Sequence, residues 1–144
     1  MAKAAPTRSA PKTVAPNATP EERRWLEEHR DRLSKTTLRA KWVHGPGDRP
    51  DRPGQTLVTR SHEVIRAWAA ARDARPAIAT RRGDRPGVLR FDFRGDGGRL
   101  EPVDWDEWFR TFDERKLVML FQETTRDGRQ SNFFRFDSPE REEG

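Results

Sequence analysis

The three histidines are the residues best suited to catalysis or metal binding, and they lie in unrelated surroundings. His29 is in a charged segment, His44 in a stretch rich in proline and glycine, and His62 at the start of an apolar segment. They therefore share no motif spacing. The chain has no cysteine, which excludes disulfides and thiolate metal ligands. We expect no metal and no other cofactor.

Asp104, Asp106 and Glu107 are close enough in sequence to suggest a pair of acid and base groups. They also occupy the first turn expected for a helix, where the N-cap preference and the helix dipole favour carboxylates without any catalytic role. The glycines of RGDGG at 94–98 lack the lysine and the following helix of a phosphate-binding P-loop. Neither pattern indicates catalysis, and we expect the protein not to be an enzyme.

The basic residues are the strongest indication of a ligand. The net charge is +5, and residues 1–60 contain 13 Lys and Arg against 7 Asp and Glu, whereas residues 61–144 contain 16 against 17. A basic N-terminal region is typical of nucleic-acid binding, because each cation near a phosphate releases condensed counterions. However, 24 of the 29 basic residues are Arg, a bias that a GC-rich genome also produces. Both explanations stay open.

The candidate nucleic-acid contacts are cations of this basic region together with two residues, Phe133 and Arg135, on the outer face of a predicted sheet. Aromatic and arginine side chains on an open sheet face stack with bases in several single-strand-binding modules. The candidates are Lys3, Arg8, Lys12, Arg39, Lys41, Arg60, Phe133 and Arg135.

A protein partner is the alternative ligand. Trp25, Trp42 and the outer face of the sheet could contact another protein or a second copy of the chain. The N-terminal helix could equally cover that face within one molecule. The sequence thus predicts a non-catalytic binding module, and nucleic acid and protein remain alternative partners.

Length and composition limit the elements that can position these residues. A chain of 144 residues corresponds to about one domain. Only 32% of its residues are hydrophobic and 37% are charged, which indicates that part of the chain does not pack into a core. We predict a disordered basic arm (1–18), an N-terminal helix and extension (19–43), a Pro/Gly-rich linker (44–58), a folded core (59–137) and a disordered acidic tail (138–144).

The N-terminal helix has a clear start signal. Thr19, followed by Pro20 and Glu22, forms a capping box and predicts a helix from Pro20 to Leu33. Residues 34–43 are compatible with a short strand or with a further helical turn, and the sequence does not decide between them.

The core begins with a helix that Ser61 caps and that ends near Asp73, with Val64, Ile65, Trp68 and Ala71 on one face. Ala77–Ala79 predicts a small edge strand. The next prediction is a half-buried strand in GVLRFDF (87–93), where Leu89, Phe91 and Phe93 alternate with polar residues.

The aromatic segment after Asp104 predicts a second core helix. Trp105, Trp108, Phe109 and Phe112 have the spacing of one helix face. The following segment LVMLFQE (117–123) is apolar on both faces and predicts a central strand.

Asp127-Gly128 predicts a hairpin with a two-residue loop. That loop fixes the register, so that Phe121 faces Phe134 and Met119 faces Phe136. Together these elements predict an α+β fold: a small antiparallel sheet of three or four strands with two helices on one face.

The chain has no apolar run long enough for a signal peptide or for a membrane span of about 20 residues. We therefore expect a cytoplasmic protein without a membrane partner.

Three sequence blocks, HEVIRAWA, GVLRFDF and WDEWFRTFDE, resemble a family of short uncharacterised bacterial proteins. The resemblance covers about residues 61–136. Members of this family are often labelled automatically as 1,4-alpha-glucan branching enzymes. Such an enzyme needs a (β/α)₈ barrel of roughly 250 residues with carboxylates at its strand ends. The present chain is too short for that barrel, so the resemblance implies no catalytic residue.

Overall fold

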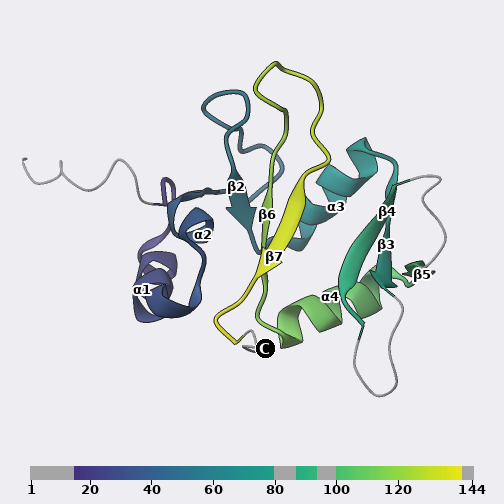
Figure 1. Cartoon of the computed structure of the whole chain (residues 1–144), viewed down its shortest axis with the longest axis horizontal. Helices are drawn as coiled ribbons and strands as arrows, with labels where there is room; N and C mark the ends of the chain where they lie inside the picture. Colours follow the sequence, from purple (N-terminus) through teal and green to yellow (C-terminus); the bar gives the residue numbers. More distant parts are fainter. Residues whose placement is uncertain (1–14, 80–86, 94–99, 141–144) are drawn as a thin grey trace, which may run out of the picture.

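The computed structural model describes residues 15–79, 87–93 and 100–140 and confirms an α+β fold (Figure 1). The helices are α1 (Pro20–Glu28), the 3₁₀ helix η3 (Arg30–Arg32), α2 (Lys35–Arg39), α3 (His62–Ala71) and α4 (Trp105–Glu114). The strands are β1 (Lys41–Trp42), β2 (Leu57–Thr59), β3 (Ala74–Ala79), β4 (Leu89–Phe93), β5 (Leu100–Pro102), β6 (Val118–Phe121) and β7 (Phe134–Asp137).

The strands form two sheets, whereas the sequence had predicted one. The larger sheet has the order β1-β2-β6-β7, and the smaller has the order β4-β3-β5. All pairs are antiparallel except β1 and β2. The strand predicted at Ala77–Ala79 is present as part of β3, but its position at a sheet edge was wrong, because β3 is the central strand of the smaller sheet. It begins soon after α3, since Asp73 has a positive φ of 57° that reverses the chain there.

The main core lies between the two sheets and the helices α3 and α4. α4 buries Trp108, Phe109 and Phe112 as its aromatic spacing predicts. α3 buries Val64, Ile65 and Trp68, as expected, but Ala69 rather than Ala71 completes its buried face. Two indole N–H groups connect the helices to strands: Trp68 Nε1 donates to the Gln122 carbonyl at 3.0 Å, and Trp108 Nε1 donates to the Arg90 carbonyl at 3.0 Å.

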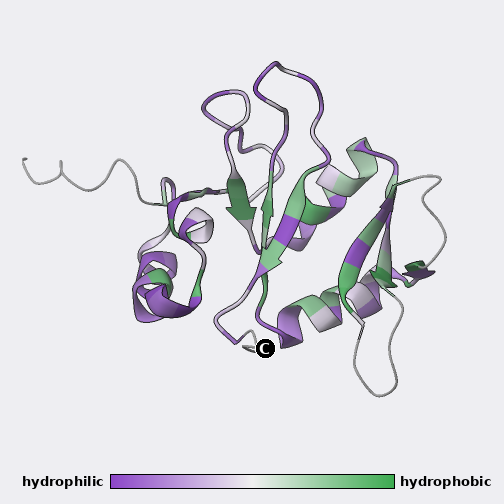
Figure 2. Cartoon of the chain, in the orientation of Figure 1, coloured by the Kyte–Doolittle hydropathy of each residue, from purple (hydrophilic) through white to green (hydrophobic). Residues whose placement is uncertain are grey.

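A second core lies on the opposite face of the larger sheet. Helices α1 and α2 pack there, away from α3 and α4 (Figure 1). Leu26 and Leu33 contribute to it from the helical side, and Trp42, Val58 and Leu120 from the sheet. The hydrophobic residues of β2 and β6 contrast with the largely hydrophilic α1 (Figure 2). The N-terminal helices are thus part of the fold rather than an appendage.

The predicted hairpin register is confirmed. Phe121 pairs with Phe134 and Met119 pairs with Phe136 in the ladder between β6 and β7. As a result the half-buried Phe134 and Phe136 pack on the same main core as Met119 and Phe121.

The turn of this hairpin differs from the prediction. The Gly128 N–H donates to the Thr125 carbonyl at 3.0 Å, and Thr125 N–H donates to the Arg129 carbonyl at 2.8 Å, so the loop has three residues. Gly128 has a φ of 89°, as a type I turn with a glycine bulge requires. The bridge between Thr124 and Gln130 is consequently offset by one residue from the ladder. Between this bridge and the ladder, the first strand has two residues (122–123) and the second has three (131–133). The extra residue in the second strand restores the predicted register.

The predicted helix from Pro20 to Leu33 needs correction. α1 ends at Glu28, and the chain continues to Leu33 through η3 rather than as one helix. The segment between Leu26 and Leu33 has no apolar side chain to bury, so packing does not hold it in α-helical form. Residues 34–43 contain both structures that the sequence allowed, first α2 and then β1.

Three predicted segment boundaries also shift. The linker predicted to reach residue 58 ends earlier, because Leu57–Thr59 forms β2 at the middle of the larger sheet. Of the predicted arm, Ala15 is fully buried and Asn17 Nδ2 donates to the Trp42 carbonyl at 2.8 Å, while 1–14 lie outside the described residues. Of the predicted tail, Ser138 is buried and residues 141–144 lie outside the described part. β5 was not predicted at all.

We expect Gly128→Ala to lower the free energy of unfolding by about 1–2 kcal/mol, because an L-residue at positive φ is strained. A Cβ at this glycine meets no atom within 4 Å, so the backbone conformation alone determines the effect. Urea denaturation measures it. Gly45→Ala is the matched control, since its Cβ also meets no atom and its φ is not positive. Equal stability of the two variants would contradict this account of the turn.

Candidate functional site

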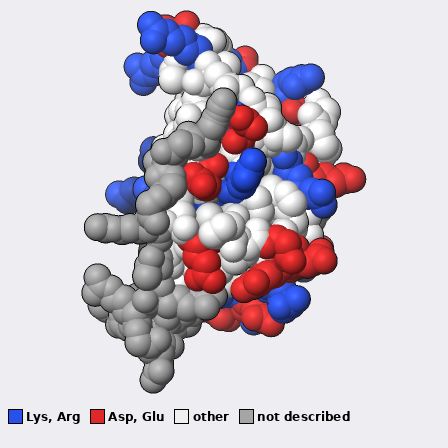
Figure 3. All heavy atoms as spheres, turned by 90° about the vertical axis from the view of Figure 1, so that its right-hand side faces the viewer, with Lys and Arg blue, Asp and Glu red and all other residues white. Residues whose placement is uncertain are grey.

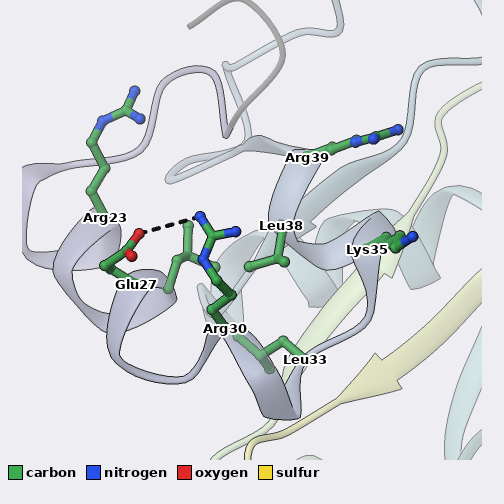
Figure 4. A pocket seen from close by; sticks show the side chains of 8 residues that line it. Arg23, Glu27, Arg30, Leu33, Lys35, Leu38 and Arg39 are labelled. Carbon is green, nitrogen blue, oxygen red and sulfur yellow. Dashed lines mark hydrogen bonds and ion pairs between the residues drawn. The ribbon is translucent and has the colours of Figure 1, made fainter. Parts of the chain in front are cut away.

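A groove between α1 and α2 combines positive charge with an apolar floor (Figure 4). Its volume is about 620 Å³. Leu26 and Leu33 are buried and Leu38 is half-buried, and together they form the floor. The charged lining consists of Arg23, Glu27, Arg30, Lys35 and Arg39. We call these eight residues the α1/α2 groove.

Four cations and one carboxylate line this groove. Glu27 is the carboxylate, and its Oε1 lies 3.3 Å from Arg30 Nη2. In Figure 4 Arg30 turns towards Glu27, whereas Arg39 from α2 extends outwards. Arg23 from α1 points away from Glu27, and its Nη2 donates to the Ala15 carbonyl at 3.2 Å. The groove therefore keeps an excess of positive charge at its rim.

A second hollow of about 680 Å³ lies on the other side of α2. Lys35 and Arg39 line both hollows, and Arg52 adds a further cation to the second one. Its carboxylate, Asp51, accepts a 2.8 Å hydrogen bond from Lys41 Nζ. That bond, with Gln55 assisting, holds the pKa of Asp51 below its ordinary value. We call the cations of the two hollows, Arg23, Arg30, Lys35, Arg39 and Arg52, the basic surface.

Asp137 fixes the position of α2 at the centre of this surface. Its carboxylate is 2% exposed and accepts hydrogen bonds from the Ser34 N–H at 2.9 Å and from the Thr37 hydroxyl. Ser34 also caps α2, because its hydroxyl accepts from the Thr37 N–H at 3.1 Å. Lys35 and Arg39 therefore project from a helix that is tied to the end of β7.

The structure brings two of the candidate residues to this region. Arg39 belongs to the basic surface, and Arg135 Nη2 lies 3.3 Å from the Ser34 hydroxyl, at the start of α2. Phe133 is 40% exposed. Lys3, Arg8 and Lys12 lie outside the described residues.

The other two candidates are engaged elsewhere. Lys41 Nζ donates to the Arg49 carbonyl at 2.9 Å as well as to Asp51. The Arg60 guanidinium lies 4.2 Å from the ring centroid of Trp25. Neither side chain lines the basic surface.

The aromatic face expected to meet a protein partner is covered within the molecule. Trp42 and Leu120 are fully buried beneath α1 and α2, and Trp25 is half-buried against the same core. The outer sheet face is therefore not open to a partner at these residues.

Sequence reasoning missed most of the basic surface. Arg23, Arg30, Lys35 and Arg52 resemble the ordinary solvated charges of a helix or a loop. The available signal was the leucine spacing: Leu26 and Leu33 must pack against a neighbour, and that packing places the cations around them on the rim of one groove.

The remaining polar clusters have structural roles. His62 Nε2 lies 3.0 Å from Asp113, and the His62 ring stacks on Phe109 at 4.0 Å. Arg72 is 8% exposed, and its Nε donates to the Ser131 carbonyl at 2.6 Å, which ties α3 to the hairpin. Burial lowers the pKa of Arg72, and Glu123 partly opposes that shift. Within 15–79, 87–93 and 100–140, no three His, Asp or Glu side chains gather where they could hold a metal ion.

The charge of the molecule differs between its two ends. α4 carries Asp106, Glu107, Asp113 and Glu114 against the single cation Arg110. Acidic side chains gather on the side of the molecule that lies at the right of Figure 1 (Figure 3). The basic surface lies on α1, η3, α2 and the loop before β2, at the other end.

Comparisons of the chain with models of protein families, with curated proteins and with solved structures give no match. In the described part of the chain, no helix has the length and apolar character needed to span a bilayer.

We expect Asp137→Ala to lower the free energy of unfolding by about 3 kcal/mol, because it leaves the half-buried N–H of Ser34 and the buried hydroxyl of Thr37 without this acceptor. Chemical denaturation measures this change. Asp113→Ala is the control, since its ion pair with His62 is exposed and such pairs contribute about 0–1 kcal/mol. If Asp137→Ala lowers the free energy of unfolding no more than Asp113→Ala does, the buried carboxylate does not hold α2 in place.

Proposed function

We propose that this protein is a non-catalytic module that binds nucleic acid through its phosphates along the basic surface. One observation carries the proposal: Lys35 and Arg39 line both hollows, so cations line a continuous path across α2. A single small anion needs only one cluster of cations, such as that of one hollow. A chain of phosphates uses a series of them, and contacts of this kind supply much of the affinity of nucleic-acid-binding proteins.

The distribution of charge supports the same proposal. An extended polyanion is attracted to the cations of the basic surface and repelled by the acidic α4, which favours one orientation of the ligand. The attraction comes from the cations that line the two hollows, because α1 as a whole carries four glutamates against two arginines. The basic residues of the arm, Lys3, Arg8 and Lys12, precede Pro16, which lines the second hollow. We include the cations of the arm in the proposal because of this position in the chain. A cytoplasmic location is part of the proposal.

A protein-interaction module is the second candidate. The observation that favours it is the apolar floor of the α1/α2 groove, because an acidic peptide with apolar side chains also matches leucines surrounded by cations. The two tryptophans Trp25 and Trp42 do not support this alternative, since Trp42 is fully buried and Trp25 is half-buried against the second core.

We expect the double variant Lys35→Gln/Arg39→Gln to weaken binding of a single-stranded oligonucleotide and to lower the slope of log K against log salt by about 1.4, as the loss of two phosphate contacts predicts. Fluorescence anisotropy at several salt concentrations measures both quantities. The matched control is Arg110→Gln/Arg129→Gln, which removes the same charge from α4 and from the hairpin loop. An equal loss of binding in the two variants would mean that net charge alone drives association.

The contribution of the arm is a separate prediction. Lys3→Gln/Arg8→Gln/Lys12→Gln in the full chain should lower the same slope by about 2, because three cations near the nucleic acid are removed. An unchanged slope would remove the arm from the binding surface and leave α1 and α2 as the whole site. The full chain is used because Ala15, Trp42 and Leu57 are buried, so a truncation at residue 60 would remove part of the core.

A further inference from the structure

We infer that the α1/α2 groove selects single-stranded nucleic acid and seats a base on its leucine floor. This inference rests on the proposed function. It goes further because it names the form of the ligand and the part of the nucleotide that enters the groove.

The apolar floor is the first step of the argument. Binding of phosphates requires cations alone, yet the cations Arg23, Lys35 and Arg39 surround the half-buried Leu38 and the buried Leu26 and Leu33. A nucleotide has both chemistries, because its phosphate is anionic and the face of its base is largely apolar. The groove therefore matches a phosphate at its rim together with a base on its floor.

The size of the groove is the second step. Its volume of about 620 Å³ lies within the range of roughly 300–1,000 Å³ that is typical of small-molecule sites. A base with its sugar fits such a space. In a duplex the bases are stacked inside, and only the phosphates and the sugars reach a protein surface outside the grooves. A single strand can turn a base outwards, so it can use the floor and a duplex cannot.

The lining also predicts weak selectivity among bases. The eight residues of the groove include no aromatic side chain, and the only carboxylate, Glu27, is bound to Arg30. Base contacts are then mainly apolar contacts with leucine, which every base can make. We expect preference for single strands without strong preference for sequence.

The test compares two single-stranded probes of about ten nucleotides, a length within the range that single-strand-binding modules cover. One probe is oligothymidylate. The other is an abasic sugar–phosphate chain of the same length and charge. The full-length protein should bind oligothymidylate about fivefold more tightly, which is the gain expected from burying a modest apolar area. This comparison on the unmodified protein does not depend on how any variant folds.

Leu38→Gln should reduce that preference to about one while binding of the abasic chain is retained. Leu38 is suitable because it is only half-buried at the margin of the second core, whereas Leu26 and Leu33 are among the buried residues of that core. Val88→Gln is the matched control. Val88 is 49% exposed and lies outside the groove, so this variant should keep the fivefold preference.

The outcomes separate the inference from the proposed function. Equal, salt-dependent binding of the two probes, or equal binding of single strand and duplex, would overturn the inference and leave the proposed function standing. Absence of binding to both probes would overturn both. If neither probe binds but a labelled peptide of alternating glutamate and leucine does, and Leu38→Gln abolishes that binding, the groove is a protein-docking site and both are wrong.

Discussion

The structure depends on one constraint: strand β6 has no polar face. Val118, Met119, Leu120 and Phe121 are all fully buried, so both faces of the larger sheet must be covered. Met119 and Phe121 face the main core, and Val118 and Leu120 face the second core. Helices α3 and α4 and the smaller sheet cover the first face. The N-terminal segment covers the other, mainly through Leu26, Leu33 and Leu38 together with Ala15, Ala40 and Trp25. This requirement brings α1 and α2 together, and the groove between them follows from it.

Local patterns predicted the core elements well. The capping box of α1, the N-cap of α3, the aromatic spacing of α4 and the alternation in β4 each depend on neighbouring residues, and the structure confirms them. The register of the hairpin was also correct, although the turn that was used to derive it was not. The loop is one residue longer than predicted, and the extra residue within 131–133 compensates. The inward-facing Phe134 and Phe136 thus determine the register more strongly than the turn does.

The features that were missed depend on contacts between distant parts of the chain. β2 has only three residues after a stretch rich in proline and glycine, and nothing local indicates that β1 and β6 flank it. The division into two sheets likewise follows from which strands meet. Of the candidate site, Arg39 was found because it is basic. Arg23, Arg30 and Lys35 were not distinguished from other surface charges, because their grouping depends on how Leu26, Leu33 and Leu38 pack.

The most direct test of the account is an NMR titration of the isotope-labelled full chain with a short single-stranded oligonucleotide. We expect the largest amide shift changes in α1, η3 and α2, with little change in α4, because the basic surface and the apolar floor lie between the N-terminal helices. A smooth pattern spread over all exposed cations, or changes concentrated at the hairpin around Phe133, would contradict the assignment of the binding surface to the α1/α2 groove.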